Sequence, residues 1–293
     1  MKLSVREMAT LVVILFGEMS STFAFINNVG RIAYVVLTHR SPCTPRGAAN
    51  DKNWFTDILR PFLPEAMDAD ALKEQENIRR MQYPEQYPAT YEMNEISIDE
   101  DRSSREAQLV RPLLKQTQLE SRPLKIIYDA RKDGWSAASF HGCVDSFGAA
   151  VVLGKTKSGA YVGGYNPKGW ASTGGARPSV AAFLFYEKFP LSKDGVVFQK
   201  LRKVGGGGLA CSFDEPNYGI AFGPDALVIN MQQPNPQMAK SKLGPYYEQG
   251  PDGLSSILTS GREELIDLKI LVGRYEKGED IPYSGAVLDM TSG

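Results

Sequence analysis

Histidine and cysteine are scarce in this sequence, with two and three residues respectively among 293. His39 and Cys43 lie near the N-terminus, so that a folded domain further along would hold His141, Cys143 and Cys211. A structural zinc site needs four ligands, mostly of these two residue types. We therefore expect no metal site, and nothing else in the sequence indicates a cofactor.

A charge excess and a long apolar run are also absent. Lysine plus arginine number 33 against 34 acidic residues, so no global field attracts the chain to nucleic acid or to an acidic membrane. No apolar stretch approaches the roughly 20 residues that a membrane-spanning helix needs, so we expect no transmembrane span. A hydrophobic content of 42% can form a substantial core, and 28 glycines and 18 prolines indicate many turns.

The first 22 residues have the layout of a secretory signal peptide. Lys2 and Arg6 precede a short apolar run, residues 9–17, and small polar residues follow at positions 20–22. The run is too short to be a spanning helix. The alternative is an ordinary N-terminal helix packed on a core.

Residues 23–50 have the composition of a transit peptide, without acidic residues and with arginine interleaved with serine and threonine. A signal peptide followed by such a stretch resembles the bipartite targeting of plastid (chloroplast) proteins in algae whose plastids lie inside extra membranes. The aromatic at the junction, Phe23 before Ala24, is the most specific part of this resemblance. Import into a plastid through the secretory route is the first prediction, and simple secretion is the alternative.

Residues 51–122 read as an acidic linker that is partly helical or disordered. Two helices are plausible, one near residues 54–59 and one from Asp68 to about Met81, where acidic residues suit the helix N-terminus. The segments "YPEQYPATYE" and "SIDEDRSSRE" combine proline with charge and cannot bury much surface. A short recognition segment in the tyrosine-proline part is an alternative to a solvated linker.

The folded domain is predicted over residues 123–293 and is rich in short strands. "LKIIYDA" indicates a buried strand, a turn at Asp133-Gly134 follows it, and a short helix begins at Ser136. Further strands are predicted in "AAVVLGKTKSGAYVGGYN", as a hairpin, and in "SVAAFLFYE", "GVVFQKL", "LACSFD", "YGIAFG", "ALVIN" and "LIDLKILVGRYEKG". This pattern predicts a mainly antiparallel α+β fold, a two-sheet β-sandwich with small flanking helices.

Five motifs in this order resemble the TLDc domain family over about residues 124–276. They are "YDARKDGW" with a helix carrying Phe140, "YVGGYNPKGW", the strand "AAFLFYE", a glycine row followed by "YGIAFGPDALVI", and "LIDLKILVGRYE". The positions that carry the resemblance are Asp133, Gly134, Gly163, Gly164, Trp170, Gly205, Gly206, Gly207, Gly208, Gly223 and Asp225.

The resemblance implies a protein-binding module that protects against oxidative stress, in some members through the vacuolar-type proton pump. Between residues 230 and 265 the sequence departs from the family, because a polar, proline-rich stretch replaces the usual loop that bears histidine and cysteine. Partner surfaces often lie on such loops, which puts binding to the pump in doubt.

The glycine row at 205–208 could bind a phosphate or could allow close packing. A phosphate-binding loop needs a lysine and a helix after the glycines, whereas "LACSFD" follows here. We interpret the row as the start of a strand at which the backbone lies close to packed side chains.

Catalytic candidates are few, and we expect no catalytic residue. Cys143 and Cys211 are candidate redox residues, but a free cysteine is more often a buried apolar residue. Gly142 makes helical continuation from His141 to Asp145 unfavourable, so we expect no fixed partner for the imidazole. Asp214, Glu215 and Asp225 fit turn positions better than an acid-base pair. The alternative is a small thiol-dependent hydrolase or peroxide-handling enzyme that uses Cys143, His141 or Cys211.

Overall fold

A computed structural model describes residues 69–190, 195–205, 208–211 and 213–283, together with the backbone of three strands near the N-terminus. The chain divides into two compact units, residues 1–65 and 66–293. In the first unit, β1 (Leu11–Ile14), β2 (Ser21–Ile26) and β3 (Ile32–Leu37) form an antiparallel sheet in that order. The helix predicted near residues 54–59 lies outside the described residues.

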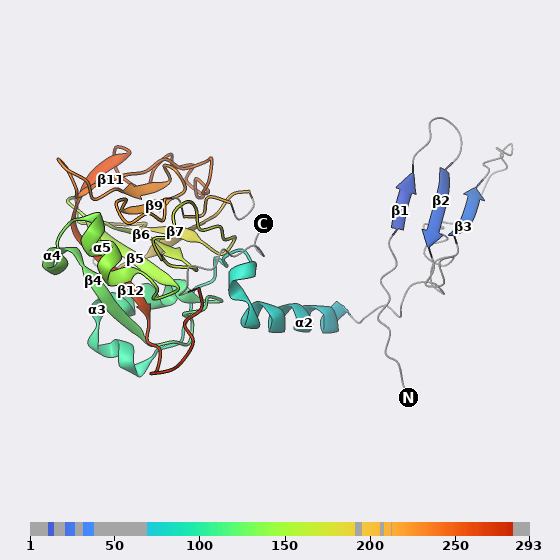
Figure 1. Cartoon of the computed structure of the whole chain (residues 1–293), viewed down its shortest axis with the longest axis horizontal. Helices are drawn as coiled ribbons and strands as arrows, with labels where there is room; N and C mark the ends of the chain where they lie inside the picture. Colours follow the sequence, from blue (N-terminus) through green and yellow to red (C-terminus); the bar gives the residue numbers. More distant parts are fainter. Residues whose placement is uncertain are drawn as a thin grey trace. The chain divides into compact units, whose positions relative to one another are not determined.

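The second unit contains nine strands and a few short helices among its described residues (Figure 1). The helices are α2 (Ala69–Gln82), α3 (Arg105–Val110), α4 (Ala130–Asp133) and α5 (Ala137–Val144), and the 3-10 helices are η1 (Pro84–Gln86), η2 (Asp99–Ser103) and η3 (Arg111–Leu114). The strands are β4 (Leu124–Asp129), β5 (Ala150–Thr156), β6 (Tyr161–Asn166), β7 (Phe183–Glu187), β8 (Phe198–Arg202), β9 (Ile220–Phe222), β10 (Leu227–Ile229), β11 (Met238–Lys240) and β12 (Arg262–Gly273). Among the helices described here, none has the length and apolar character that a membrane crossing requires.

Most of the predicted elements are confirmed. The helix predicted from Asp68 to Met81 is α2, and the hairpin predicted around Ser158-Gly159 is β5 and β6. β4, β7, β8, β9, β10 and β12 lie where the sequence predicts strands. The segment "LACSFD" is different, because its described residues make only isolated bridges through Cys211. β11 was not predicted.

One long strand joins the described strands of the second unit into a single antiparallel sheet. The order is β8-β7-β6-β5-β12-β11-β10-β9, and β4 pairs with β12 as well. β12 is 12 residues long, so its first part pairs with β11 while its last part pairs with β4. The fold is therefore α+β and largely antiparallel, and the two-sheet sandwich expected from the sequence is not shown.

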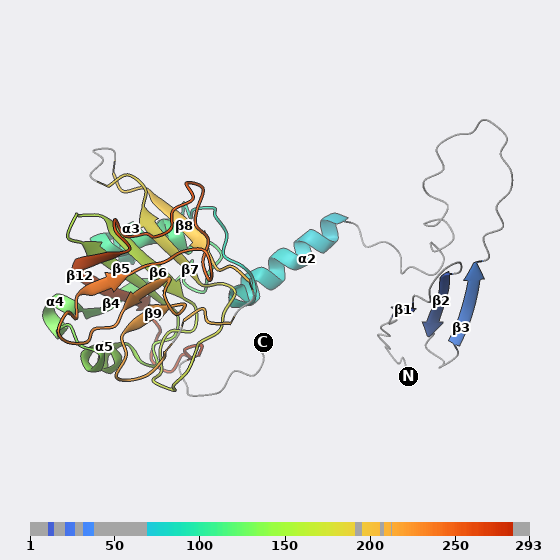
Figure 2. The same ribbon diagram turned by 90° about the horizontal axis from the view of Figure 1, so that it is seen from above.

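The β9–β11 part of the sheet packs against the β5–β7 part (Figures 1 and 2). A Cβ atom built on Gly164 of β6 would lie 2.7 Å from Cζ of Phe222 on β9, which is too close for any larger residue. On the other face of β6, a Cβ on Gly163 would lie 1.9 Å from the carbonyl oxygen of Val152. The two glycines thus allow close packing on both faces of one strand.

Residues 84–122 cover the second face of the sheet, although composition assigned them to a linker. Leu113, Leu114 and Leu119 are fully buried against the sheet, in the same core as Phe183 and Phe185. These leucines lie within "LVRPLLKQTQLE", which is short and follows a strongly charged stretch. Average composition therefore hid the apolar residues that fold this segment onto the sheet.

Polar side chains fix the same segment. Arg111 is 4% exposed, pairs with Asp101 and donates to the carbonyl oxygens of Leu119 and Arg122. The ammonium group of Lys200, also buried, donates to the carbonyl oxygens of residues 90 and 92. Burial lowers the pKa of Lys200 to about 8. Because residues 84–122 supply hydrogen-bond acceptors to both buried cations, the segment belongs to the folded domain.

Candidate functional site

Helix α5 positions His141 at the edge of the core. Ser136 caps the helix, since its side chain accepts a hydrogen bond from the N–H of Ser139. Phe140 and Val144 are buried on the inner face. This packing carries the helix through the exposed Gly142 to Val144, with Asp145 as the C-cap, so the expectation that Gly142 keeps the helix from bringing Asp145 to His141 is wrong.

The His141 ring contacts the end of its own helix and two other segments. Nδ1 lies 2.7 Å from Oδ1 of Asp145 and 3.0 Å from Oγ of Ser172. The Ser172 hydroxyl donates a short hydrogen bond to the other oxygen of Asp145. Nε2 lies 2.8 Å from the carbonyl oxygen of Tyr218. The expectation that His141 has no fixed partner is therefore also wrong.

Asp214 holds the loop that carries Ser172. Its carboxylate, in a side chain that is 1% exposed, accepts from the N–H groups of Ala171, Ser172 and Thr173 and from the Thr173 hydroxyl. Arg177 Nη1 lies 3.6 Å from the same carboxylate. Asp214 therefore fixes a loop, which agrees with the interpretation that it has no acid-base role.

Hydrogen-bond geometry indicates that His141 is an imidazolium. A carbonyl oxygen only accepts, so Nε2 carries a hydrogen, and the Asp145 carboxylate requires a second hydrogen on Nδ1. Burial lowers the pKa of His141, but the hydrogen bonds to Asp145 and to the Tyr218 carbonyl outweigh it, so the pKa is raised above 6.5. Both ring nitrogens are donors, and neither can act as a general base.

Ser172, His141 and Asp145 consequently differ from a catalytic triad. In a triad the aspartate and the serine contact opposite nitrogens of the histidine ring. Here both contact Nδ1, and Nε2 is occupied by Tyr218. The arrangement can stabilise charge and fix loops, but it cannot activate the serine.

His141 and Asp145, now together with Asp214, are the one group of three potential metal ligands among the described residues. Ligand atoms of His141, Asp145 and Asp214 all lie within 4.8 Å of one another. Each already has protein partners, because the histidine binds Asp145 and Tyr218 while Asp214 accepts from the 171–173 loop. An ion would have to displace these bonds, so the group fits a structural network better than a metal site.

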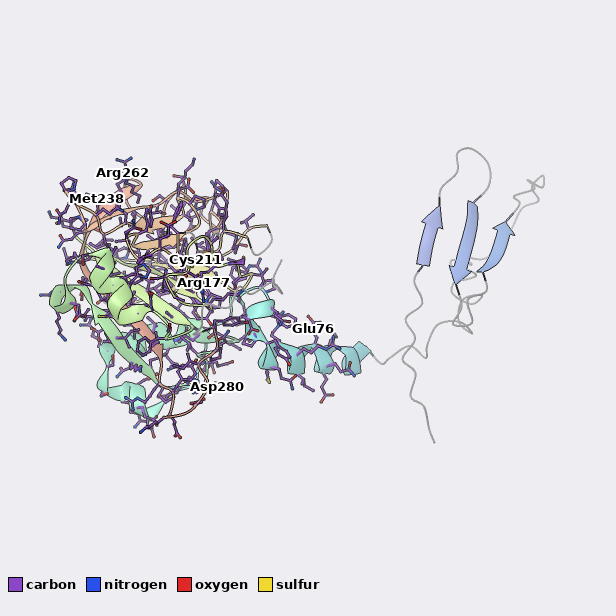
Figure 3. The ribbon with its side chains drawn as sticks, in the orientation of Figure 1. Glu76, Arg177, Cys211, Met238, Arg262 and Asp280 are labelled. Atoms are coloured by element: carbon purple, nitrogen blue, oxygen red, sulfur yellow. The ribbon has the colours of Figure 1, made fainter. Side chains whose placement is uncertain are left out.

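The two candidate redox cysteines are free thiols with little tendency to ionise. Cys143 is half-buried on α5, and burial together with the nearby Asp133 raises its pKa. Cys211 is buried beside Arg177, with which it forms a β-bridge, and burial raises its pKa strongly (Figure 3). A thiolate nucleophile needs the opposite shift.

The two described glycines of the row, Gly205 and Gly208, do not have the role that the sequence suggested. A Cβ atom built on Gly205 or on Gly208 would contact nothing within 4 Å, so close packing does not explain these two glycines. Gly205 has a φ angle of +65°, which favours glycine for conformational reasons. Gly206 and Gly207 lie outside the described residues.

Other motif positions support turns and the core. Gly134 has a φ angle of +90°, and its carbonyl oxygen accepts from the Tyr128 hydroxyl. Trp170 is fully buried and makes edge contacts with the rings of Phe140 and Phe222. Asp133 accepts from the N–H of Asp129, Gly223 has a φ angle of +59°, and Asp225 lies 3.9 Å from Lys242.

Sequence reasoning rejected Asp145 as a partner of His141 and missed Ser172 and the Tyr218 carbonyl. The four-residue spacing of His141 and Asp145 is a signal for contact on one helix face. No comparable signal marks Ser172 or Tyr218, which are 31 and 77 residues from His141.

The fold and this network define an α+β domain built on one antiparallel sheet, with loops fixed by buried polar groups. Its family follows from comparison with known proteins. The TLDc domain model matches residues 103–252, and the chain belongs to the TLDc domain family. A comparison with curated proteins gives no significant match.

Proposed function

We propose that this protein is a non-enzymatic TLDc-domain protein that protects against oxidative stress by binding other proteins. The observation that carries the proposal is the use of both His141 nitrogens as donors, to Asp145 and to Tyr218. Without a free ring nitrogen, the residue best suited to base chemistry near neutral pH is committed to structure. Membership of the family supports a role in binding.

The experiment is survival under peroxide in cells that lack the native protein and express variants. Ser172→Ala, Cys143→Ser and Cys211→Ala each remove a potential nucleophile. We expect each folded variant to protect as well as the wild type at equal protein level. Loss of protection by a variant with unchanged urea unfolding would refute the non-enzymatic proposal.

The second candidate function is a thiol-dependent hydrolase or peroxide-handling enzyme that uses Cys143, His141 or Cys211. Partial exposure of Cys143 favours it, because a peroxide could reach this sulfur. The raised pKa of both thiols argues against it. In the survival experiment, loss confined to Cys143→Ser would favour this enzyme.

We also propose that the protein works in a plastid, with residues 1–22 as signal peptide and 23–50 as transit-like segment. A fluorescent protein fused behind residues 1–50 should enter plastids, and fluorescence in the medium would favour secretion. N-terminal sequencing of the native protein should find a start near Asp51, and a fragment that begins at Met1 would contradict processing.

Pull-down from intact plastids would identify the partner, and a plastid location would separate the protein from the vacuolar-type proton pump.

A further inference from the structure

Four cations from different elements line one small pocket of the second unit, residues 66–293, which we call the TLDc unit. Arg105 lies at the start of α3, Arg131 in α4, Lys155 in β5 and Lys269 in β12. Helix α3 packs against β5 and α4 packs against β12, which brings these side chains around a pocket of about 240 Å³. These four residues are far apart in the sequence, so no run of lysine and arginine marks this basic surface.

Part of the lining of this pocket is apolar. Leu153 is 4% exposed and belongs to the core on this face of the sheet, with Leu109 and Tyr161 packed beside it. Ile266 on β12 is 48% exposed at the pocket. A half-exposed isoleucine beside buried leucine offers apolar surface to a ligand.

The charges of the pocket do not cancel. Its two acidic residues, Glu106 and Asp267, both pair with Lys269. Lys155 lies over the Tyr161 ring, with Nζ 5.2 Å from the centroid. Within the part of the chain that the structure describes, Arg105 and Arg131 have no carboxylate partner. The pocket therefore has four cationic and two anionic side chains, although the whole chain has a net charge of −1.

We propose that this pocket binds a small organic anion with an apolar body. A carboxylate or phosphate group would contact the guanidinium groups of Arg105 and Arg131, which match the planar, bidentate geometry of such oxygens. The apolar body would lie on Leu153 and Ile266. The pocket, at about 240 Å³, is smaller than the roughly 300–1,000 Å³ of typical ligand sites, so the ligand is smaller than a typical drug.

Calorimetric titration of the full chain tests the pocket with four probes. Benzoate and phenyl phosphate carry the two head groups, benzyl alcohol lacks the charge, and inorganic phosphate lacks the apolar body. We expect saturable binding of benzoate or phenyl phosphate that weakens in high salt, and the stronger of the two identifies the head group. Absence of binding, or equal affinity for benzyl alcohol or inorganic phosphate, would overturn the proposal.

Variants show where the probe binds. Arg105→Ala and Arg131→Ala should each weaken binding by about tenfold or more, because a hydrogen bond to a charged group contributes at least about 1.5 kcal/mol. Arg262→Ala is the matched control, since Arg262 is exposed on the same strand as Lys269 but outside the pocket (Figure 3). All three arginines are exposed, so the fold should persist, with unchanged urea unfolding. Equal affinity in all three variants would place the probe elsewhere and reject the site.

Discussion

A single charged ring, the imidazolium of His141, joins segments that are distant in the sequence. Its contact with Asp145 holds the end of its own helix, and its contact with Ser172 holds the loop that Asp214 fixes. Its hydrogen bond to the Tyr218 carbonyl holds the segment before β9. His141 is 4% exposed, so its charge depends on these partners rather than on water. We therefore expect His141 to stabilise the folded domain to an extent that depends on pH.

Replacing Asp145 with asparagine should destabilise the domain in a pH-dependent way. Because the folded-state pKa of His141 is raised above 6.5, its contribution is fully present below that pH and is lost as pH rises through the folded value. We expect Asp145→Asn to lower the free energy of unfolding by about 1.5–3 kcal/mol near pH 6 and by less near pH 9. Urea unfolding at the two pH values measures this, with the exposed Asp99→Asn as control. An equal loss at both pH values would mean that the histidine charge is not involved.

Glycines that look alike in sequence should respond in opposite directions to alanine. Gly163→Ala would place Cβ 1.9 Å from a backbone carbonyl oxygen, so we expect a loss of stability of more than about 3 kcal/mol. Gly142 lies in α5 with nothing within 4 Å of its Cβ position, so Gly142→Ala should stabilise the helix by about 0.5–1 kcal/mol. Midpoints of urea unfolding compare the two. Destabilisation by Gly142→Ala would show that α5 needs a glycine there.

Among the elements of the TLDc unit, β12 has the largest structural role because it pairs with β4, β5 and β11. Its residues Leu265, Leu268, Ile270 and Val272 are fully buried in the core shared by both ends of the sheet. Ile266 on the same strand is half-exposed. The strand therefore provides a test of burial within one element.

Ile270→Asp should unfold the domain, whereas Ile266→Asp should not. A carboxylate at the fully buried position would lack a partner and remove apolar packing, with an expected loss of more than about 4 kcal/mol. At the half-exposed position the charge stays in water, and we expect a loss below about 1 kcal/mol. Thermal unfolding followed by circular dichroism distinguishes the two. A wild-type midpoint for Ile270→Asp would show that β12 is not a core strand.

Local pattern predicts local elements well in this chain and long-range pairing poorly. β-branched runs and turn residues marked the β5–β6 hairpin and β12, and Ser136 marked the start of α5, because these signals act within a few residues. The pairing of β12 with three strands and the contact of Ser172 with His141 depend on tertiary packing, which leaves no local signal. The strand predicted at "LACSFD" is wrong for the same reason, because the apolar residues Ala210 and Cys211 reach the core from a loop.

At the scale of the whole molecule, the folded unit begins earlier than its strands. Residues 84–122 add buried leucines and the Arg111–Asp101 pair to the sheet. The first strand of this unit, β4, starts only at Leu124. The family match also begins before that strand, at residue 103. Without this segment, the face that carries Phe183 and Phe185 would be exposed to water.

A fragment of residues 83–293 should therefore fold, whereas a fragment of residues 124–293 should aggregate or bind a hydrophobic dye. The shorter fragment loses Leu113, Leu114 and Leu119, and burying each such side chain contributes about 1.5–3 kcal/mol, comparable in sum to the whole stability of a domain. It also leaves Lys200 without the two carbonyl oxygens that accept from its ammonium group. Size-exclusion chromatography and thermal unfolding of both fragments measure the difference, with the full chain as reference. Cooperative unfolding of residues 124–293 at the midpoint of the longer fragment would mean that residues 84–122 cover the sheet without stabilising it.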